Sequence, residues 1–298
     1  MPVPVFTHPD CVRHDPGPGH PETPARLAAV LARMVADPNA EVHEVPAGSR
    51  EDLLLVHPEA HLQQLEGMSR VGGGVLSLDT VASESSWAAV LGATGAIHAA
   101  LDQAHHSGGH AFAAVRPPGH HALAQRAMGF CLVNNVVVAA RRAQRLGRER
   151  VLIIDWDVHH GNGTQALVEG DSRVRYVSLH QHPWYPGTGM AEERGVGNVF
   201  NVPRGPGAPA SLYVEDLWSA VVAATTGWAP SLVLISAGYD ALKGDPLGGF
   251  TLEPSDFAKI TTRLRERLPA VPIVALLEGG YTPERVADGV AATVAALV

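Results

Sequence analysis

Short apolar runs that alternate with longer helical segments constrain this chain most strongly. The runs VLII at 151–154 and LVLI at 232–235 contain no polar residue, which is typical of strands that helices cover on both faces. From about residue 110 onward, such runs alternate with Ala- and Leu-rich segments of helical length. This alternation predicts an α/β fold with a mostly parallel sheet between layers of helices.

The same patterning predicts where the individual elements lie. Strands are expected at 3–7, 111–115, 150–155, 174–179, 198–202, 232–236 and 272–277. Helices are expected at 24–35 and 86–105, and others are expected to begin near Leu132, Thr164, Pro209, Ser255 and Pro283. The run VGGGV at 71–75 lacks the Lys-Ser/Thr of a phosphate loop and predicts a flexible loop. Because no linker or repeat interrupts the chain, a single domain over residues 1–298 is expected.

Composition indicates which cellular compartment and which partners to expect. The formal net charge of −8 argues against nucleic acid as a direct partner. The only cysteines, Cys11 and Cys131, lie far apart, so a reducing cytoplasm is expected rather than a disulfide framework. Neither a signal-peptide pattern nor an apolar run of membrane length is present, and a cytoplasmic protein with no membrane partner is expected.

Polar side chains follow the predicted strands at the points where the strands end. In chain order they are His120 and His121, then Asp157, His159 and His160, then the segment HQHPWYPGTG at 180–189, then Asp240, and finally Tyr281. Because the carboxyl ends of parallel strands meet at one edge of a sheet, these clusters are expected to converge on a single crevice.

The segment DWDVHH at 155–160 predicts part of a metal site. In an extended chain Asp155, Asp157 and His159 share one face, and His160 points to the other. Asp157 and His159 supply two ligands for a divalent ion, and Asp240 is the best candidate for the third. Two carboxylates and one imidazole leave an open position for water, as in hydrolytic zinc sites. The alternative, that these aspartates only cap helices or form turns, is disfavoured by the histidines nearby.

The adjacent histidines predict acid and base catalysis. Imidazole titrates in the useful range, so His120 and His121 together supply a base for the attacking water and an acid for the leaving group. A carboxylate such as Asp155 holds one imidazole in its charged form, whereas Asn162 orients the other without charging it. The phenol of Tyr281 is placed to donate to a developing oxyanion.

Five ordered motifs resemble those of the zinc-dependent histone deacetylase family, in particular its class II members, the bacterial histone-deacetylase-like amidohydrolases and the acetylpolyamine amidohydrolases. They are RPPGHHA, GFC..NN, DWDVHHGNGT, SAGYDALKGDPLGG and EGGY, and the resemblance extends from HPETPARL at residue 20 to the last helix. It implies the arginase/deacetylase fold, a three-layer α/β/α arrangement with an eight-stranded parallel sheet. It also implies Zn²⁺ held by Asp157, His159 and Asp240, in agreement with the ligands argued above.

The resemblance further implies a role for each catalytic residue. His121 acts as general base and then as acid, while His120 stays protonated against Asp155. Tyr281 polarises the acyl carbonyl. Asn162 stands where class I enzymes carry the second dyad carboxylate, as it does in class II.

Substrate and potassium sites are implied in the same way. The walls of an acyl-lysine tunnel are Phe130 and Tyr185, and most members carry Phe at the second position. The other implied substrate-binding positions are a backbone acceptor at Gly129, the rim residue Asp79, the position Leu247, and Arg26 on an acetate exit channel. A structural K⁺ is implied near Asp155, Asp157, His159, Ser178 and Leu179, mainly through carbonyl groups.

These residues predict a zinc-dependent amidohydrolase that removes acetyl or related acyl groups from acyl-lysine-like amines. The first alternative is a deacetylase of acetylpolyamines or other small N-acyl amines. Leu247 weakens this alternative because a polyamine-selective relative carries Glu there, and the segment 67–83 is too short for the insertion through which acetylpolyamine amidohydrolases dimerise. A dimanganese ureohydrolase is disfavoured by His160, which stands where another Asp is expected, and a catalytically silent acyl-binding protein is disfavoured by the complete set of ligands. The acyl group, the amine, replacement of zinc by Fe²⁺ in the cell, and the choice between a monomer and a weak homo-oligomer stay open.

Overall fold

An eight-stranded sheet forms the centre of the computed structural model, which describes residues 1–298. All neighbouring strands are parallel, and their order across the sheet is β2-β1-β5-β10-β9-β6-β7-β8. The strands are β1 (Val3–Thr7), β2 (Ala40–Glu44), β5 (Ala111–Ala113), β6 (Val151–Asp155), β7 (Val174–Gln181), β8 (Val199–Arg204), β9 (Leu232–Ala237) and β10 (Ile273–Leu277). The predicted parallel α/β sheet is therefore confirmed.

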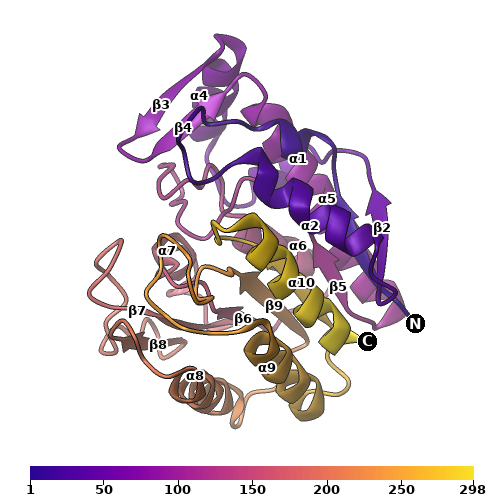
Figure 1. Ribbon diagram of the computed structural model, residues 1–298, viewed down its shortest axis with the longest axis vertical. Helices are drawn as coiled ribbons and strands as arrows, with labels where there is room; N and C mark the ends of the chain where they lie inside the picture. The colour runs from indigo at the N-terminus through magenta and orange to yellow at the C-terminus, as the bar shows by residue number, and fades with distance from the viewer.

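Helices cover both faces of this sheet (Figure 1). One layer contains α5 (Ser86–Ser107), α6 (Asn135–Arg145) and α7 (Asn162–Val168), and the other contains α2 (Pro24–Val35), α8 (Ala210–Thr225), α9 (Pro254–Arg267) and α10 (Pro283–Leu297). The shorter helices α1 (Asp10–Arg13), α3 (Arg50–Leu53) and α4 (Glu59–Arg70) lie in the N-terminal third of the chain. None of the helices combines the length and the apolar character that a membrane span requires.

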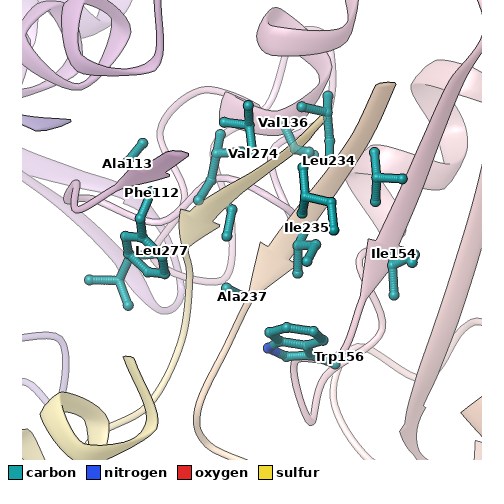
Figure 2. Close-up of a cluster of buried hydrophobic side chains, with 14 of the residues drawn as sticks. Phe112, Ala113, Val136, Ile154, Trp156, Leu234, Ile235, Ala237, Val274 and Leu277 are labelled. Atoms are coloured by element: carbon teal, nitrogen blue, oxygen red, sulfur yellow. The ribbon is translucent and has the colours of Figure 1, made fainter. Parts of the chain in front are cut away.

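The core lies on and around the central strands. Every residue of β6, β9 and β10 is buried, as expected of strands covered on both faces. Figure 2 shows Leu234 and Ile235 of β9 packed among side chains of the neighbouring strands, with the Trp156 indole beyond the end of β6. Truncating one such side chain to Ala typically costs about 2–5 kcal/mol, so these strands form a rigid support for the loops that follow them.

Helix boundaries follow local capping chemistry. The helix predicted at 24–35 is observed with the same limits, and Pro24 occupies its first turn. The helix expected from Leu132 begins instead at Asn135, because the Asn134 side chain caps it by accepting the Val137 N–H at 3.1 Å. Similarly, the helix expected from Thr164 begins two residues earlier, at Asn162.

The prediction of a flexible loop at 71–75 was wrong. Residues Gly73–Ser77 form β3, which pairs antiparallel with β4 (Thr80–Ser83). Gly73 has a φ of 107°, and a Cβ there would lie 2.4 Å from the Ala82 carbonyl oxygen. The glycines therefore permit close strand pairing, and the turn of this hairpin carries Asp79.

Candidate active site

Five neighbouring strands carry the polar clusters at their carboxyl ends. β5, β10, β9, β6 and β7 are adjacent in the sheet although they are far apart in the sequence. The loops that follow them supply the two histidines, Tyr281, Asp240, the segment 155–160 and the segment 182–190. The predicted convergence of these clusters at one edge of the sheet is therefore observed.

Asp157, His159 and Asp240 gather around a single point. One ligand atom from each lies within 4.8 Å of the others, and all three residues are buried. His159 Nδ1 lies 3.1 Å from Asp157 Oδ1 and 3.2 Å from Asp240 Oδ2. The backbone of Gly238 lies close against the Asp157 carboxylate. Only glycine leaves room for this arrangement, because a Cβ on Gly238 would lie 2.1 Å from Asp157 Oδ2.

Backbone donors hold the two carboxylates of this triad. The Gly279 N–H donates to Asp157 Oδ2 at 2.9 Å, and the Val158 N–H donates to Asp240 Oδ1 at 2.8 Å. Burial and the adjacent charge of Asp157 raise the pKa of Asp240 to about 7. Two buried carboxylates this close repel each other, and a divalent cation between them would relieve that repulsion.

His120 lies in an acidic environment. Its Nδ1–H donates to Asp155 Oδ2 at 3.1 Å, and its Nε2 lies 3.8 Å from Asp157 Oδ1. Burial opposes the charged imidazole, but the Asp157 and Asp155 carboxylates outweigh it and raise the pKa of His120 well above its usual value. The Tyr176 hydroxyl also donates to Asp155 Oδ2, at 2.9 Å, which fixes that carboxylate against the ring.

His121 is hydrogen-bonded to a neutral partner and faces the pocket. Its Nδ1–H donates to Asn162 Oδ1 at 2.8 Å, while Asn162 Nδ2 lies 3.5 Å from Met128 Sδ. Because Nδ1 is the donor, Nε2 is the nitrogen left to accept a proton. Burial and the neighbouring charge of His120 lower the pKa of His121 well below its usual value. As predicted, His160 points away from the triad, and it contacts Thr188 and Gln165 instead.

Tyr281 reaches the same pocket from the loop after β10. Its backbone N–H donates to Asp245 Oδ2 at 2.7 Å, and Asp245 Oδ1 accepts the Leu247 N–H at 2.9 Å. Burial and the nearby Asp240 carboxylate raise the pKa of the Tyr281 phenol well above its usual value. The phenol therefore remains a hydrogen-bond donor at neutral pH.

A cavity of about 240 Å³ leads to these groups. It is lined by Asp79, His121, Gly129, Phe130, His159, Trp184, Tyr185, Leu247 and Tyr281. All the tunnel and rim residues implied by the resemblance are thus in its wall, except Arg26, which lies behind Tyr281 with its guanidinium 5.0 Å from the ring centroid. The sequence reasoning missed Trp184, although it is adjacent to Tyr185, and the Trp184 indole N–H donates to the Leu247 carbonyl at 2.8 Å.

The β3–β4 hairpin supports one wall of this cavity. Asp79 Oδ1 accepts the Gly129 N–H at 3.1 Å, and the Thr80 hydroxyl accepts the Phe130 N–H at 3.0 Å. Phe130 has a φ of 67°, a conformation that non-glycine residues rarely adopt. The hairpin therefore helps to hold the Phe130 ring in place, a contact that no sequence pattern indicated.

Two buried charged residues, Glu22 and Arg116, were not indicated by the sequence patterns, although their neighbour Arg26 was. Glu22 accepts from Arg26 Nη1 at 2.6 Å and from Arg116 Nη2 at 2.6 Å, and all three residues are fully buried. Arg26 Nη2 also donates to the Glu278 carbonyl at 2.5 Å. Glu22 and Arg116 stand inside two of the quoted motifs, HPETPARL and RPPGHHA, but no local pattern indicated that they are buried and paired with each other.

The residues of the expected K⁺ site are also near one another. The β6–β7 register places Asp155 opposite Ser178, which is followed by Leu179. The Ser178 hydroxyl lies 2.9 Å from His180 Nδ1. Binding of K⁺ by these residues together with Asp157 and His159 stays a prediction.

Comparisons with known proteins agree with this geometry. Residues 20–297 match the Histone deacetylase domain family. The chain is 41% identical to an uncharacterized protein of Synechocystis sp., with 99% of both chains covered. It is 37% identical to the Histone deacetylase-like amidohydrolase of Pseudomonas aeruginosa, over 88% of this chain and 72% of that protein. The crystal structure of the HDA15 HD domain matches with a TM-score of 0.94 and 34% identity, covering 99% of this chain and 90% of that chain.

The family match spans most of the chain, and the solved structure shares the arrangement of the sheet and its helices. The resemblance drawn from the five motifs and the arginase/deacetylase fold that it implied are both confirmed. The chain belongs to the histone deacetylase family, a family of deacetylases and amidohydrolases that generally depend on a metal ion.

Proposed function

We propose that the protein is a zinc-dependent amidohydrolase that removes acetyl or related acyl groups from acyl-lysine-like amines. The observation that carries this proposal is the cavity itself. The same space of about 240 Å³ is lined by His121, His159 and Tyr281 at the reacting end and by Phe130 and Tyr185 along its walls. A base, a candidate metal ligand and a phenol donor are therefore all within reach of one narrow apolar slot.

The donor set fits a divalent ion. Asp157, His159 and Asp240 would hold it, because one imidazole nitrogen faces two carboxylate oxygens and a single N–H cannot satisfy both. Three protein ligands of this kind suit catalytic zinc, with Fe²⁺ as the alternative in the cell. When bound, such an ion supplies Lewis acidity that lowers the pKa of a water to about 7 and polarises an acyl carbonyl.

His121 would carry the proton during the reaction. Its Nε2 takes the proton of the attacking water, because Nδ1 is committed to Asn162 and the ring is uncharged. Once the carbonyl carbon becomes tetrahedral, the same Nε2–H donates to the departing amine. His120, charged against Asp155, remains a fixed positive group beside this step.

Tyr281 would stabilise the oxyanion. Its phenol stays protonated, and the hydrogen bond from its backbone to Asp245 fixes where the side chain begins. A donor positioned in this way contributes typically about 10²–10³ in rate. Phe130 and Tyr185 would exclude bulk water and pack against the methylenes of an extended alkyl chain.

Acyl-lysine is favoured over acylated polyamines by the charges at the cavity. Asp79 is the only carboxylate in its lining, and its Oδ1 already accepts N–H and O–H groups of Gly129, Ser77 and Thr80. Leu247 adds an apolar group where a second cation of a polyamine would need a partner. A deacetylase of small N-acyl amines stays the second candidate.

One experiment tests the proposal. Purified protein is analysed for bound metal and assayed against acyl-lysine peptides and N-acetylated polyamines, with kcat/KM measured for each. We expect one zinc or iron per chain and higher kcat/KM for acyl-lysine. Higher kcat/KM for the polyamines would select the second candidate, and a metal-free protein without turnover on either class would refute the proposal.

A further inference from the structure

Glu278 is a buried carboxylate that the steps above do not use. It directly follows β10 and precedes the Gly279-Gly280-Tyr281 segment, and its side chain is 1% exposed. It does not line the cavity, and it contacts the backbone of the loop that carries the two histidines. A buried carboxylate requires partners, so its contacts indicate what it does.

Its two oxygens join the loop after β5 to the end of β9. Oε2 accepts the Gly119 N–H at 2.6 Å and the His120 N–H at 3.2 Å. Oε1 accepts the Ser236 hydroxyl at 3.3 Å. Neither the Gly119 nor the His120 N–H has a backbone acceptor, so Glu278 supplies the acceptor for both.

In the loop that carries the histidines, the carbonyl groups are held by other residues: the His120 carbonyl accepts the Thr164 N–H at 3.0 Å, and the Pro117 carbonyl accepts from Asn135 Nδ2 at 3.0 Å. The Gly119 and His120 N–H groups, by contrast, are held by Glu278. Residues 114–134 belong to no helix or strand longer than an isolated bridge. Pro117 and Pro118 have no N–H to donate, so Gly119 and His120 are the first backbone donors after them. Glu278 therefore anchors this loop just where the catalytic pair begins.

We propose that Glu278 is a positioning residue that fixes the backbone of the two histidines, a role that rests on the proposed function of that pair in proton transfer. It acts as a hydrogen-bond acceptor rather than as a charge. The His120 ring already has Asp155 at 3.1 Å and Asp157 at 3.8 Å, and both favour its charged form more strongly than Glu278 does. The two backbone N–H groups, in contrast, have no substitute acceptor.

Three variants separate position from charge. Glu278→Gln keeps the length, its carbonyl can accept both N–H groups, and its amide can donate to the Ser236 hydroxyl. Glu278→Asp keeps the charge but is one methylene too short, and Glu278→Ala removes the acceptor. Asp37→Ala is the matched control, because Asp37 is also buried and accepts a backbone N–H, from Asn39 at 2.9 Å, but lies outside the cavity lining.

Kinetics on an acetyl-lysine peptide give the first readout. We expect kcat to fall about tenfold to a hundredfold in Glu278→Ala and in Glu278→Asp, with KM within about twofold. Glu278→Gln should stay within about threefold of the wild type, and Asp37→Ala should match it. Higher kcat in Glu278→Asp than in Glu278→Gln would show that charge matters and would overturn the proposal.

Amide hydrogen exchange gives a second readout that does not depend on turnover. Exchange at Gly119 and His120 should accelerate at least about tenfold in Glu278→Asp and Glu278→Ala, and stay slow in Glu278→Gln and Asp37→Ala. Unchanged exchange in the first two variants would refute the anchoring role even if activity fell. If the wild-type protein lacked deacetylase activity, the proposed function would fail, whereas exchange would still decide the anchoring.

Discussion

His120 and His121 are adjacent in the sequence, and their ring centroids lie 4.0 Å apart, yet they occupy opposite environments. His120 donates to the carboxylate of Asp155, and His121 donates to the amide of Asn162. The pKa of the first is raised, because its carboxylate neighbours outweigh the effect of burial, and the pKa of the second is lowered by burial and by the first. The carboxylates Asp157 and Asp155 therefore favour the charged form of His120, whereas burial and the charge of His120 keep His121 neutral.

The two histidines therefore suit two different roles, one as a fixed positive charge and one as a proton acceptor. A neutral imidazole that faces the cavity can accept a proton, whereas a charged one cannot. His121 is the neutral member, and it alone of the pair lines the cavity. Substitutions at either ring or at either hydrogen-bond partner test this difference between the two histidines.

Removing each ring in turn should have the largest effect. His121→Ala should lower kcat/KM for an acetyl-lysine reporter by about 10³-fold or more, because it removes the general base. In His120→Ala, the fall in kcat/KM should be at least about tenfold smaller than in His121→Ala, because this variant removes only a charge beside the base. Metal content serves as the control for both variants. Equal losses, or a larger loss in His120→Ala, would contradict the assignment of the base.

Replacing the Asp155 carboxylate tests whether the charge of His120 affects the rate. Asp155→Asn leaves both rings hydrogen-bonded to amides, so His120 loses one of the two carboxylates that hold its charge. We expect kcat/KM to fall about tenfold to a hundredfold, less than in His121→Ala. The assay is paired with a melting temperature, and Asp37→Asn is the control for loss of a buried carboxylate. Wild-type kcat/KM in Asp155→Asn would show that the charge of His120 is irrelevant.

Replacing the Asn162 amide should change how kcat/KM depends on pH. Asn162→Asp places a carboxylate on His121, which favours its charged form and raises its pKa. Because the neutral ring is the base, activity should be lost first at low pH, and the acid limb of the kcat/KM profile should move up by about one pH unit. Activity near pH 8.5 should stay close to the wild type. An acid limb that stays in place or moves down would exclude His121 as its origin.

The smallest effect is expected for Tyr176, which contacts Asp155 rather than either histidine. Tyr176→Phe removes the hydroxyl that donates to Asp155 Oδ2 at 2.9 Å. The carboxylate keeps its hydrogen bond to His120, so kcat/KM should fall only about twofold to fivefold. Losing one hydrogen bond should also lower the free energy of unfolding by about 1 kcal/mol, so the assay is run well below the melting temperature. A loss as large as that of Asp155→Asn would mean that the hydroxyl, rather than the carboxylate charge, holds His120.

Much of the fold was predictable because the central strands are buried on both faces. Their apolar runs gave β6, β9 and β10 nearly to the residue. The edge strand β2, with the sequence AEVHE, was missed, since its half-exposed residues carry polar side chains that resemble a loop. The hairpin was missed because three consecutive glycines conceal strand β3.

The candidate active site likewise contains some residues that the sequence predicts and others that it does not. Residues at the ends of recognisable strands, such as Asp157 and Asp240, were predictable from position and chemistry. Glu22, Glu278 and Asp245 were not, because a buried carboxylate acquires its role only from a distant partner. Arg116 and Glu22 are 94 positions apart, and Gly119 and Glu278 are 159 apart, so no local pattern could connect them.

The proposed chemistry requires that Asp157, His159 and Asp240 hold a single divalent ion beside the neutral imidazole of His121. The most direct measurement is an anomalous-difference map from crystals of the purified protein, recorded on either side of the absorption edges of zinc and iron. We predict one peak, within coordination distance of His159 Nδ1 and of a carboxylate oxygen from each aspartate. A map with no peak there, or with the metal held by other residues, would contradict the account.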